Sequence, residues 1–204
     1  MSWGLLLSFG LGGVGWTFAE YSIHNWVMHG GGGRNEFSRQ HLDHHADPNF
    51  FSPIWGKYLT EALVVSAMLG LGTWLAGFAP ALSFAAGFVV VYHSYEALHQ
   101  RLHTHPPKGP VGRFLRRHHM THHFVAPTKN HGVTFPLWDL AFGSYRKAPE
   151  RIVIPARHAP RWLFGPAGGV RPEFAGDYGL RGGAVTAAQQ AADRQAAYSN
   201  LAVV

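Results

Sequence analysis

The sequence predicts an all-α, integral membrane helical bundle of about three spans with a cytoplasmic, histidine-rich di-metal helical cap. Three observations predict this fold: long uncharged apolar stretches, short histidine clusters beside them, and a one-sided distribution of Lys and Arg. Only 14% of the 204 residues are charged and 47% are hydrophobic, which is a low charge fraction for a soluble domain. The length fits one domain. We place that domain at residues 1–150 and a linker-like C-terminal tail at residues 151–204.

Two apolar stretches supply the expected spans. Residues 3–19 carry no charge, and helix can continue through Glu20 toward His29. Residues 62–92 carry none either, and Pro80 divides them into two helices, roughly residues 58–79 and 81–98. Each helix approaches the ~20 residues that a transmembrane helix needs. No basic region precedes the first apolar run, so an uncleaved span is favoured over a signal peptide.

The expected spans place all histidine clusters and every Lys and Arg on one face of the membrane. No Lys or Arg precedes Arg34, and none lies between Lys57 and Arg101. By the positive-inside rule this face is the cytoplasm, which predicts a multi-pass membrane protein with cytoplasmic histidine clusters. The same bias accounts for the net charge of +6, so nucleic acid is not an expected partner.

Four histidine clusters have spacings that suit metal ligation. They contain ten residues: His24, His29, His41, His44, His45, His99, His103, His119, His122 and His123. Two clusters have the spacing i, i+3, i+4 and a third has i, i+4, so on a helix the imidazoles of each share one face. The first pair is five residues apart, about 140° around an α-helix, and can grip a metal from two sides only near a helix end. Ten imidazoles exceed the capacity of one ion, so two ions are expected, with iron, copper or zinc favoured over magnesium or calcium.

The other five histidines are weaker candidates. His93 lies inside an expected span and either lines a cavity or forms a hydrogen bond in the core. His131 is a candidate outer partner of the metal site, and His158 is expected to be solvated. His118 points away from its cluster on a helix, and His105 precedes two prolines, where helix should stop. Several carboxylates either orient imidazoles or are solvated: Glu20, Asp43, Asp47, Glu96 and Asp139.

Two further sequence features limit the chemistry. The absence of cysteine excludes disulfides, thiolate zinc sites and iron–sulfur clusters. Residues 10–15 match a dinucleotide-binding pattern in letters only, because they lie in an apolar span where small residues serve helix packing. From Arg151 onward Pro, Gly, Arg and Ala dominate, and residues 184–201 can form a helix by propensity.

Over roughly residues 20–147 the chain resembles the fatty acid hydroxylase/sterol desaturase superfamily of membrane di-iron oxygenases. The resemblance rests on His24-Asn-Trp-Val-Met-His29, His41-Leu-Asp-His44-His45 and His119-Met-Thr-His122-His123. It continues through Asn130-His131-Gly132-Val133-Thr134, Trp138-Asp139 and Phe142-Gly143-Ser144-Tyr145. The order and spacing look most like the fatty acid 2-hydroxylase branch, whereas the first string is also similar to carotenoid hydroxylases.

The resemblance implies that the ten clustered histidines bind two iron ions, which zinc can replace in purified or crystallised material. It implies O2-dependent hydroxylation of an unactivated C–H bond on a membrane lipid, foremost a fatty acyl chain. A sterol or carotenoid hydroxylase or desaturase of the same superfamily is the alternative. A membrane metal-binding or transport protein is an alternative of another class, but transport needs polar residues along the spans, and these are scarce.

The electron supply is expected to be external. Reductive O2 activation consumes electrons, and the sequence offers no haem module, iron–sulfur cluster or nucleotide-binding domain. We therefore expect a separate electron donor, either a ferredoxin or a b-type cytochrome. Arg113, Arg116 and Arg117 are its expected docking surface, because complementary charge raises association rates; the alternative is a solvated basic face.

Overall fold

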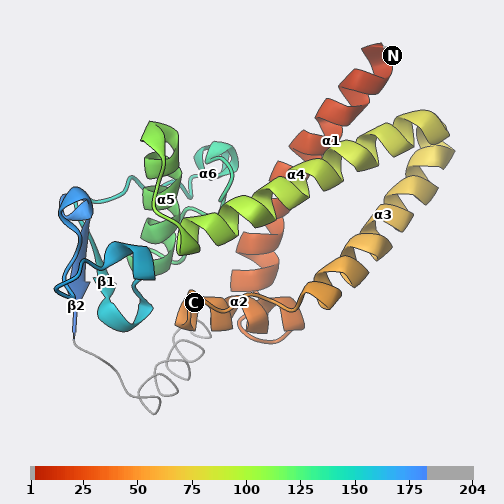
Figure 1. Ribbon diagram of the computed structural model, residues 1–204. Coiled ribbons are helices and arrows are strands. Elements are labelled where there is room, and N and C mark those ends of the chain that lie inside the picture. Colours follow the sequence, from red (N-terminus) through yellow and green to blue (C-terminus); the bar gives the residue numbers. More distant parts are fainter. Residues whose placement is uncertain (1–2, 183–204) are drawn as a thin grey trace. The chain divides into compact units, whose positions relative to one another are not determined.

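The computed structural model in Figure 1 describes residues 3–182. The described chain is mostly helical, and it divides into two compact units. The apolar unit contains residues 1–20 and 52–97, and the histidine unit contains residues 21–51 and the chain from residue 98 onward. The helix expected at residues 184–201 lies outside the described residues.

Three long helices supply the apolar unit: α1 (Trp3–Ser22), α3 (Ile54–Ala76) and most of α4 (Phe78–Thr104). Glycines allow α1 and α4 to cross with their backbones in contact, as expected for small residues in apolar helices. A Cβ atom on Gly12 would lie 2.0 Å from the carbonyl oxygen of Phe84. A Cβ atom on Gly87 would lie equally close, 2.0 Å, to the carbonyl oxygen of Phe9. The glycine-rich stretch of the first helix therefore serves helix packing.

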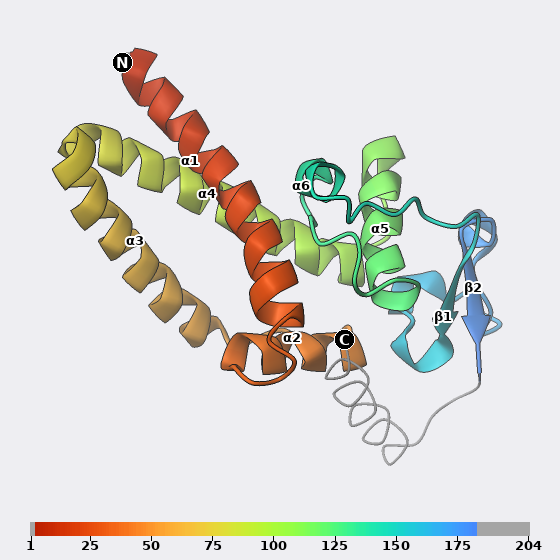
Figure 2. The same ribbon diagram turned by 180° about the vertical axis from the view of Figure 1, so that it is seen from behind.

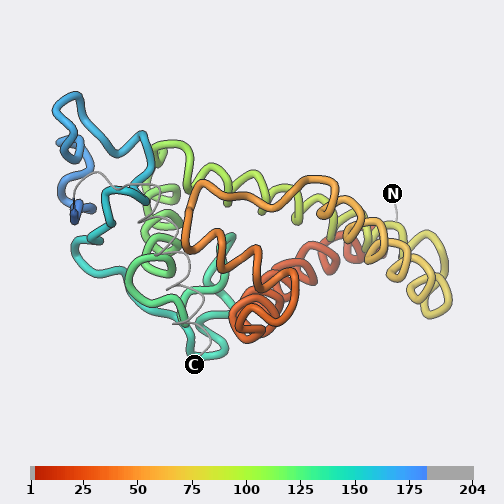
Figure 3. Tube along the Cα trace, turned by 90° about the horizontal axis from the view of Figure 1, so that it is seen from below, coloured from red at the N-terminus to blue at the C-terminus, as the bar shows by residue number. Residues whose placement is uncertain are grey.

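A hairpin joins α3 to α4 at Gly77, which has a φ of 87° (Figure 3). The helix ends predicted near residues 79 and 81 were therefore wrong by a few residues. Pro80 lies in the first turn of α4, because the N–H groups of a first turn have no acceptor within the helix and a missing donor is tolerated there. By length and hydropathy α3 and α4 can each cross a bilayer, whereas α1, the third expected span, is not among the described helices that meet this test.

The histidine unit begins where α1 passes into a π-helix, η1 (Ile23–His29). Its other helices are α2 (Glu36–Ala46), the last turns of α4, α5 (Gly109–Phe124) and α6 (Leu137–Ala141). Asn35 caps α2, since its side chain accepts a hydrogen bond from the backbone N–H of Ser38 at 2.8 Å. As predicted, α4 ends just before the two prolines at positions 106 and 107.

Residues 152–181 form a small lobe, the C-terminal lobe, with two strands that the all-α prediction did not include. It contains β1 (Ile152–Pro155), η2 (Ala156–His158), η3 (Arg161–Leu163), η4 (Pro172–Phe174) and β2 (Tyr178–Arg181). The strands pair in parallel (Figure 2), and strands of four residues are too short to be recognised by alternation. Ile152, Ile154, Leu163 and Tyr178 are fully buried and pack with Met120 of α5. The described part of the expected tail is thus packed against α5, while the domain boundary at residue 150 stays a prediction.

Candidate metal centre

The ten clustered histidines lie in two groups of five within the histidine unit. In each group, every histidine offers one ring nitrogen, and these nitrogens all lie within 4.8 Å of one another. Group A contains His24, His29, His41, His45 and His122. Group B contains His44, His99, His103, His119 and His123. Among the described residues, His105, His118 and His158 join neither group.

Helix spacing distributes the imidazoles of α2 and α5 between the groups. On α2, His41 and His45 at i, i+4 join group A, whereas His44 joins group B. The arrangement is reversed on α5, where the i, i+4 pair joins group B and His122 joins group A. Each triplet therefore contributes to both groups.

The π-helix η1 brings His24 and His29 into the same group. In an α-helix these residues would be about 140° apart. A π-helix bonds residue i to residue i+5, so residues five apart lie on one face, and Gly30 N donates to the carbonyl of Asn25 at 2.9 Å. Single π turns are rare and occur frequently at functional sites. The pair does lie at a helix end, as predicted, but the type of helix makes the geometry work.

Within group A, His41 and His122 lie on opposite sides. The Nε2 atom of each lies 2.9–3.2 Å from the Nε2 atoms of His24, His29 and His45. The ring centroids of His41 and His122 are themselves 6.2 Å apart. Two nitrogens that bind one ion at about 2.1 Å and at right angles are about 3.0 Å apart. The spacing in group A is therefore that of neighbouring ligands in one coordination sphere.

Hydrogen bonding between imidazoles does not explain the contact of His24 with His122. Nδ1 of His24 donates to the carbonyl of His131 at 2.6 Å, and Nδ1 of His122 donates to that of Lys129 at 2.7 Å. A neutral imidazole carries one N–H, so both Nε2 atoms present lone pairs. These lone pairs face each other across 3.0 Å, which is repulsive unless a cation lies between them. The residues therefore fit a bound metal ion.

Group B shows the same kind of packing. The Nε2 atoms of His44 and His99 are 3.1 Å apart, and Nδ1 of His44 donates to the carbonyl of Phe50 at 2.8 Å. The Nε2 atom of His123 is buried and has no hydrogen-bond partner among the described residues. Buried polar atoms are nearly always paired, so this nitrogen also fits a metal ligand.

Burial favours the neutral form of imidazoles in both groups. It lowers the pKa of His24 to about 4. Burial, reinforced by neighbouring imidazoles, lowers the pKa of His41 and His122 well below the usual range. The same causes lower the pKa of His119 and His123 in group B. Neutral imidazole is the form that binds a metal ion.

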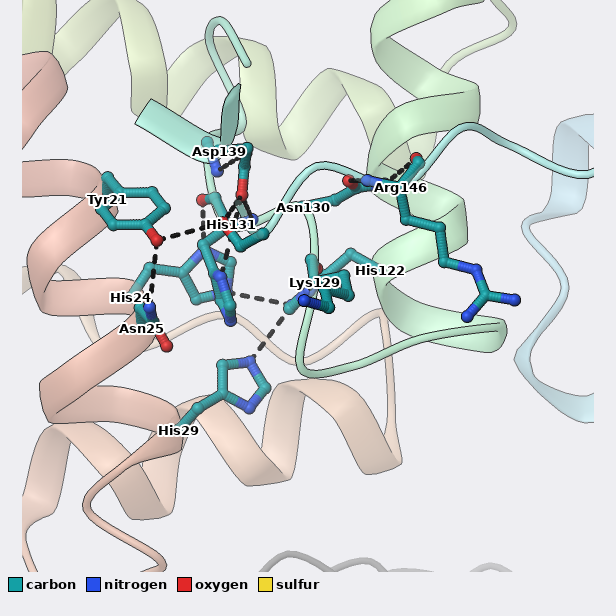
Figure 4. Close-up of polar contacts among 12 residues, drawn as sticks. Tyr21, His24, Asn25, His29, His122, Lys129, Asn130, His131, Asp139 and Arg146 are labelled. Carbon is teal, nitrogen blue, oxygen red and sulfur yellow. Dashed lines mark hydrogen bonds and ion pairs between the residues drawn. The ribbon is translucent and has the colours of Figure 1, made fainter. Parts of the chain in front are cut away.

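Asp139 anchors the chain segment whose backbone carbonyls, at Lys129 and His131, accept hydrogen bonds from His122 and His24. Its carboxylate accepts hydrogen bonds from the backbone N–H groups of His131 and Gly132, both at 2.8 Å, and from Ser144 Oγ at 2.7 Å (Figure 4). Asp139 is fully buried. Burial raises its pKa, but these hydrogen bonds and His118 Nε2 at 3.4 Å outweigh burial and lower the pKa to about 2. Of the five carboxylates considered from the sequence, Asp139 thus orients the site, but through backbone N–H groups and not through the N–H of a ligand imidazole.

Asn130 shapes the same segment. It has a φ of 61°, a conformation that residues other than glycine rarely adopt. Its side chain donates to the carbonyl of Arg146 at 2.9 Å and accepts from the backbone N–H of Arg146 at 2.6 Å (Figure 4). This turn aims the carbonyls of Lys129 and His131 at group A. The acceptors could not be found from the sequence, because every residue has a carbonyl; the string that begins at Asn130 was their only signal.

His131 lies beside group A without joining it. Its ring centroid is 5.3–5.5 Å from those of His24, His29 and His122. Burial lowers its pKa to about 3. Its contribution runs through its backbone carbonyl, which agrees with the outer position expected for it.

Other predicted residues lie elsewhere. In the apolar unit, His93 Nε2 lies 3.0 Å from a carboxylate oxygen of Glu61, and Glu96 pairs with Lys57. These polar groups on α3 and α4 bond to each other within that unit, and neither joins a metal group.

Of the three arginines expected to form a docking surface, Arg116 was wrongly placed there. Arg116 is 2% exposed, and its guanidinium lies 4.5 Å from the ring centre of Trp162. Arg113 and Arg117 both pair with Asp177, whose single negative charge offsets one of their two positive charges. Arg116 belongs to the interior because the C-terminal lobe covers that side of α5.

The sequence comparisons with known proteins all match fatty acid or fatty acyl hydroxylases. The sequence model of a protein family described as fatty acid hydroxylase matches residues 9–144. A dihydroceramide fatty acyl 2-hydroxylase of Arabidopsis thaliana is 30% identical over 150 residues, which cover 69% of this chain and 60% of that protein. A fatty acid 2-hydroxylase of Mus musculus is 30% identical over 146 residues, which cover 66% of this chain and 38% of that protein. The chain thus spans about 60% or less of the length of these curated relatives.

A solved structure shares the fold. It is described as full-length scs7p with only the hydroxylase domain visible, and it matches with a TM-score of 0.60 at 24% identity. The match covers 71% of this chain and 57% of that one.

Proposed function

This chain belongs to the fatty acid hydroxylase family, and from that premise we propose that it uses O2 to hydroxylate the acyl chain of a membrane lipid. The family resemblance predicted from the sequence is confirmed. The relatives described above are named for hydroxylation of dihydroceramide fatty acyl groups and of fatty acids, and the acyl chain is what these names share. Family membership favours an enzyme over the transport protein considered from the sequence.

The observation that carries this proposal is the presence of two five-histidine groups with ligand-like spacing. We expect group A and group B to hold one iron ion each. Bound iron supplies the reductive activation of O2 and the removal of hydrogen from an unactivated C–H bond. An all-nitrogen set accepts iron or zinc, and zinc has no redox chemistry, so iron is the ion expected in the active protein.

The protein's own part is to orient the ligands and exclude water. Backbone carbonyls accept the N–H groups of His24, His122 and His44, which leaves Nε2 of each available to a metal. The rings of both groups are largely buried, so bulk water is kept from them. A rigid, dry set of neutral imidazoles is what oxidation of an apolar chain requires.

The proposed topology has α1, α3 and α4 as spans and the histidine groups on the cytoplasmic side. The lengths and hydropathies of α3 and α4 support it. The absence of Lys and Arg before Arg34 and between Lys57 and Arg101 supports the orientation. A ferredoxin or b-type cytochrome would deliver the electrons that reductive O2 activation consumes.

Lipid mass spectrometry tests the reaction. Cells that express the chain under isotopically labelled O2 should gain one labelled oxygen on an acyl chain of a membrane lipid. Cells that express His122→Ala should not. Oxygen gained on a sterol or carotenoid, or loss of hydrogen without gain of oxygen, would replace acyl hydroxylation by one of the alternatives. No lipid change in cells with metal-loaded protein would contradict the proposal.

Cysteine labelling tests the topology. Lys108→Cys gives this cysteine-free chain a single thiol. An impermeant thiol reagent added outside intact cells should leave it unlabelled. Phe78→Cys, at the exposed start of α4, is the matched control and should be labelled. Labelling of position 108 from outside would overturn the orientation.

A further inference from the structure

The end of α4 carries two ligands of group B and lacks ordinary hydrogen-bond donors. His99 and His103 lie in its last turns. In a continuing helix the carbonyl of His103 would accept from the backbone N–H four residues on. That residue is Pro107, and the one before it is Pro106, so neither has an N–H to give. The carbonyl of a ligand residue therefore needs a donor from elsewhere.

Trp162 of the C-terminal lobe supplies that donor. Its Nε1–H donates to the carbonyl of His103 at 3.1 Å in a buried setting. Beside it, Arg116 of α5 donates from Nη2 to the carbonyl of Arg101 at 2.8 Å. The guanidinium of Arg116 lies 4.5 Å from the Trp162 ring centre, so the two donors support each other. Trp162 thus replaces the backbone donor that the carbonyl of His103 lacks, while Arg116 adds a second donor to the carbonyl of Arg101, which also accepts from the backbone N–H of His105 at 3.1 Å.

The core of the lobe holds Trp162 in this position. Its ring packs against Phe174 and Tyr178, with centroid distances of 5.0 and 6.0 Å. The same core includes Met120 of α5. Met120 follows His119, whose Nε2 lies 2.8 Å from that of His103. The lobe therefore contacts two of the three helices that supply group B, α4 and α5, although it lies beyond residues 9–144, the part of the chain that matches the family.

We propose that Trp162 is a positioning residue for the metal ion of group B: its indole N–H fixes the end of α4 and thereby sets the positions of the ligands His99 and His103. Group A does not depend on this contact, because carbonyls of residues 129–131 orient two of its ligands. This role rests on the proposed di-metal centre.

Zinc titration of metal-stripped protein in detergent, against a competing chelator, provides the test. Wild-type protein should bind two ions, and failure to do so would contradict the metal centre itself. Trp162→Phe keeps an aromatic ring in the core but removes the N–H. It should lower the affinity for one of the two ions, that of group B, by about 10- to 100-fold, the range seen when outer partners of metal ligands are lost. Wild-type affinity for both ions, or equal weakening of both, would overturn the role of Trp162.

Two further variants separate the hydrogen bond from general loss of packing. Ile154→Val removes a methyl group from the same core and keeps both rings that pack on Trp162; it should lower the melting temperature and leave both zinc affinities unchanged. In the Trp162→Phe background, replacing Pro106 and Pro107 by Ala supplies backbone N–H groups to the helix end. The weakened affinity should then recover, and no recovery would overturn the capping explanation.

Discussion

Groups A and B each gather five imidazoles, but the protein holds them by different means. In group A, Nδ1 of His24 and Nδ1 of His122 each donate to a backbone carbonyl. In group B only Nδ1 of His44 is seen to do so among the described residues, and Nδ1 of His119 and of His123 is buried with no hydrogen-bond partner in the described part of the chain. Two ligands of group A are thus oriented by backbone carbonyls, although Nδ1 of His29 also has no such partner there, whereas group B depends more on where its helices end and pack. Similar ligand sets can therefore be sensitive to changes in quite different parts of one sequence.

Removing one ligand from each group should have the largest effect. His41→Ala should lose the ion of group A, and His44→Ala, from the same helix, should lose that of group B. Affinity for the affected ion should fall by more than about 100-fold, the upper end of the effect of outer partners, and hydroxylation should stop. Elemental analysis after zinc loading should find one ion per chain in each variant and two in His158→Ala. A chain that keeps both ions without His41 or His44 would show that the residue is not a ligand.

The next largest effect is expected for Asp139→Asn, which should lower the metal affinity of group A and leave that of group B unchanged. The amide NH2 of Asn would face a backbone N–H where the carboxylate accepted one, so the 129–131 segment should shift. Affinity for the group A ion should fall by about 10- to 100-fold, with group B unchanged. Asp177→Asn, which removes a buried carboxylate paired with Arg113 and Arg117, is the control. Equal weakening of both ions by Asp139→Asn would contradict the assignment of this carboxylate to group A.

The carboxylate of Asp139 should also make a pH-dependent contribution to the free energy of unfolding. Its pKa is about 2 in the folded chain against an ordinary 3.8. A lowered folded-state pKa gives stability that is present above about pH 4 and is lost as the pH falls through about 2, with a size of about 2 kcal/mol. Denaturation of metal-stripped protein at a series of pH values would measure it, with Asp139→Asn as the reference. Parallel pH profiles for the two proteins would rule the contribution out.

Tyr21→Phe should have the smallest effect. The Tyr21 hydroxyl lies 3.0 Å from Ser144 Oγ, which in turn donates to Asp139 (Tyr21 and Asp139 are in Figure 4). The variant keeps the ring that stacks on Phe142 and removes two hydrogen bonds, the one to Ser144 and one accepted from Asn25 Nδ2 at 3.2 Å, so the unfolding free energy should fall by about 1–2 kcal/mol. Zinc affinities should stay within a few-fold of wild type. A large loss at group A would mean that ligand orientation extends out to this hydroxyl.

Residue type and spacing made much of this molecule predictable. The uncharged stretch that contains Pro80 predicted the α3–α4 hairpin, because length and hydropathy do not depend on tertiary contacts. The spacing of His41, His44 and His45 predicted a shared helix face, and all three lie within the two groups. The family was recognisable because its histidine strings combine residue type, order and distance.

Other features depend on contacts between distant residues and stayed hidden. Arg116 looked like a surface cation, because nothing in its own segment shows that Trp162 would cover it. The assignment of His44 to one group and His41 to the other follows from how α2 meets its neighbours. The lobe was missed because its strands have four residues each, bounded by Pro and Gly, and their apolar pattern is too brief to recognise.

The π turn lets the first histidine cluster hold one extra residue without changing the direction of the chain that follows. If one residue between His24 and His29 were deleted, the pair would be at i, i+4, and an ordinary α-helix would still place both rings on one face and leave the later chain in nearly the same direction. If the same residues were instead wound as an α-helix with none deleted, His29 and the chain after it would be rotated by about 100°. The link through Gly30 to α2, against which η1 packs, would then start in the wrong direction. The hydrogen bond from Gly30 to Asn25 therefore sets the course of the chain as well as the spacing of two ligands.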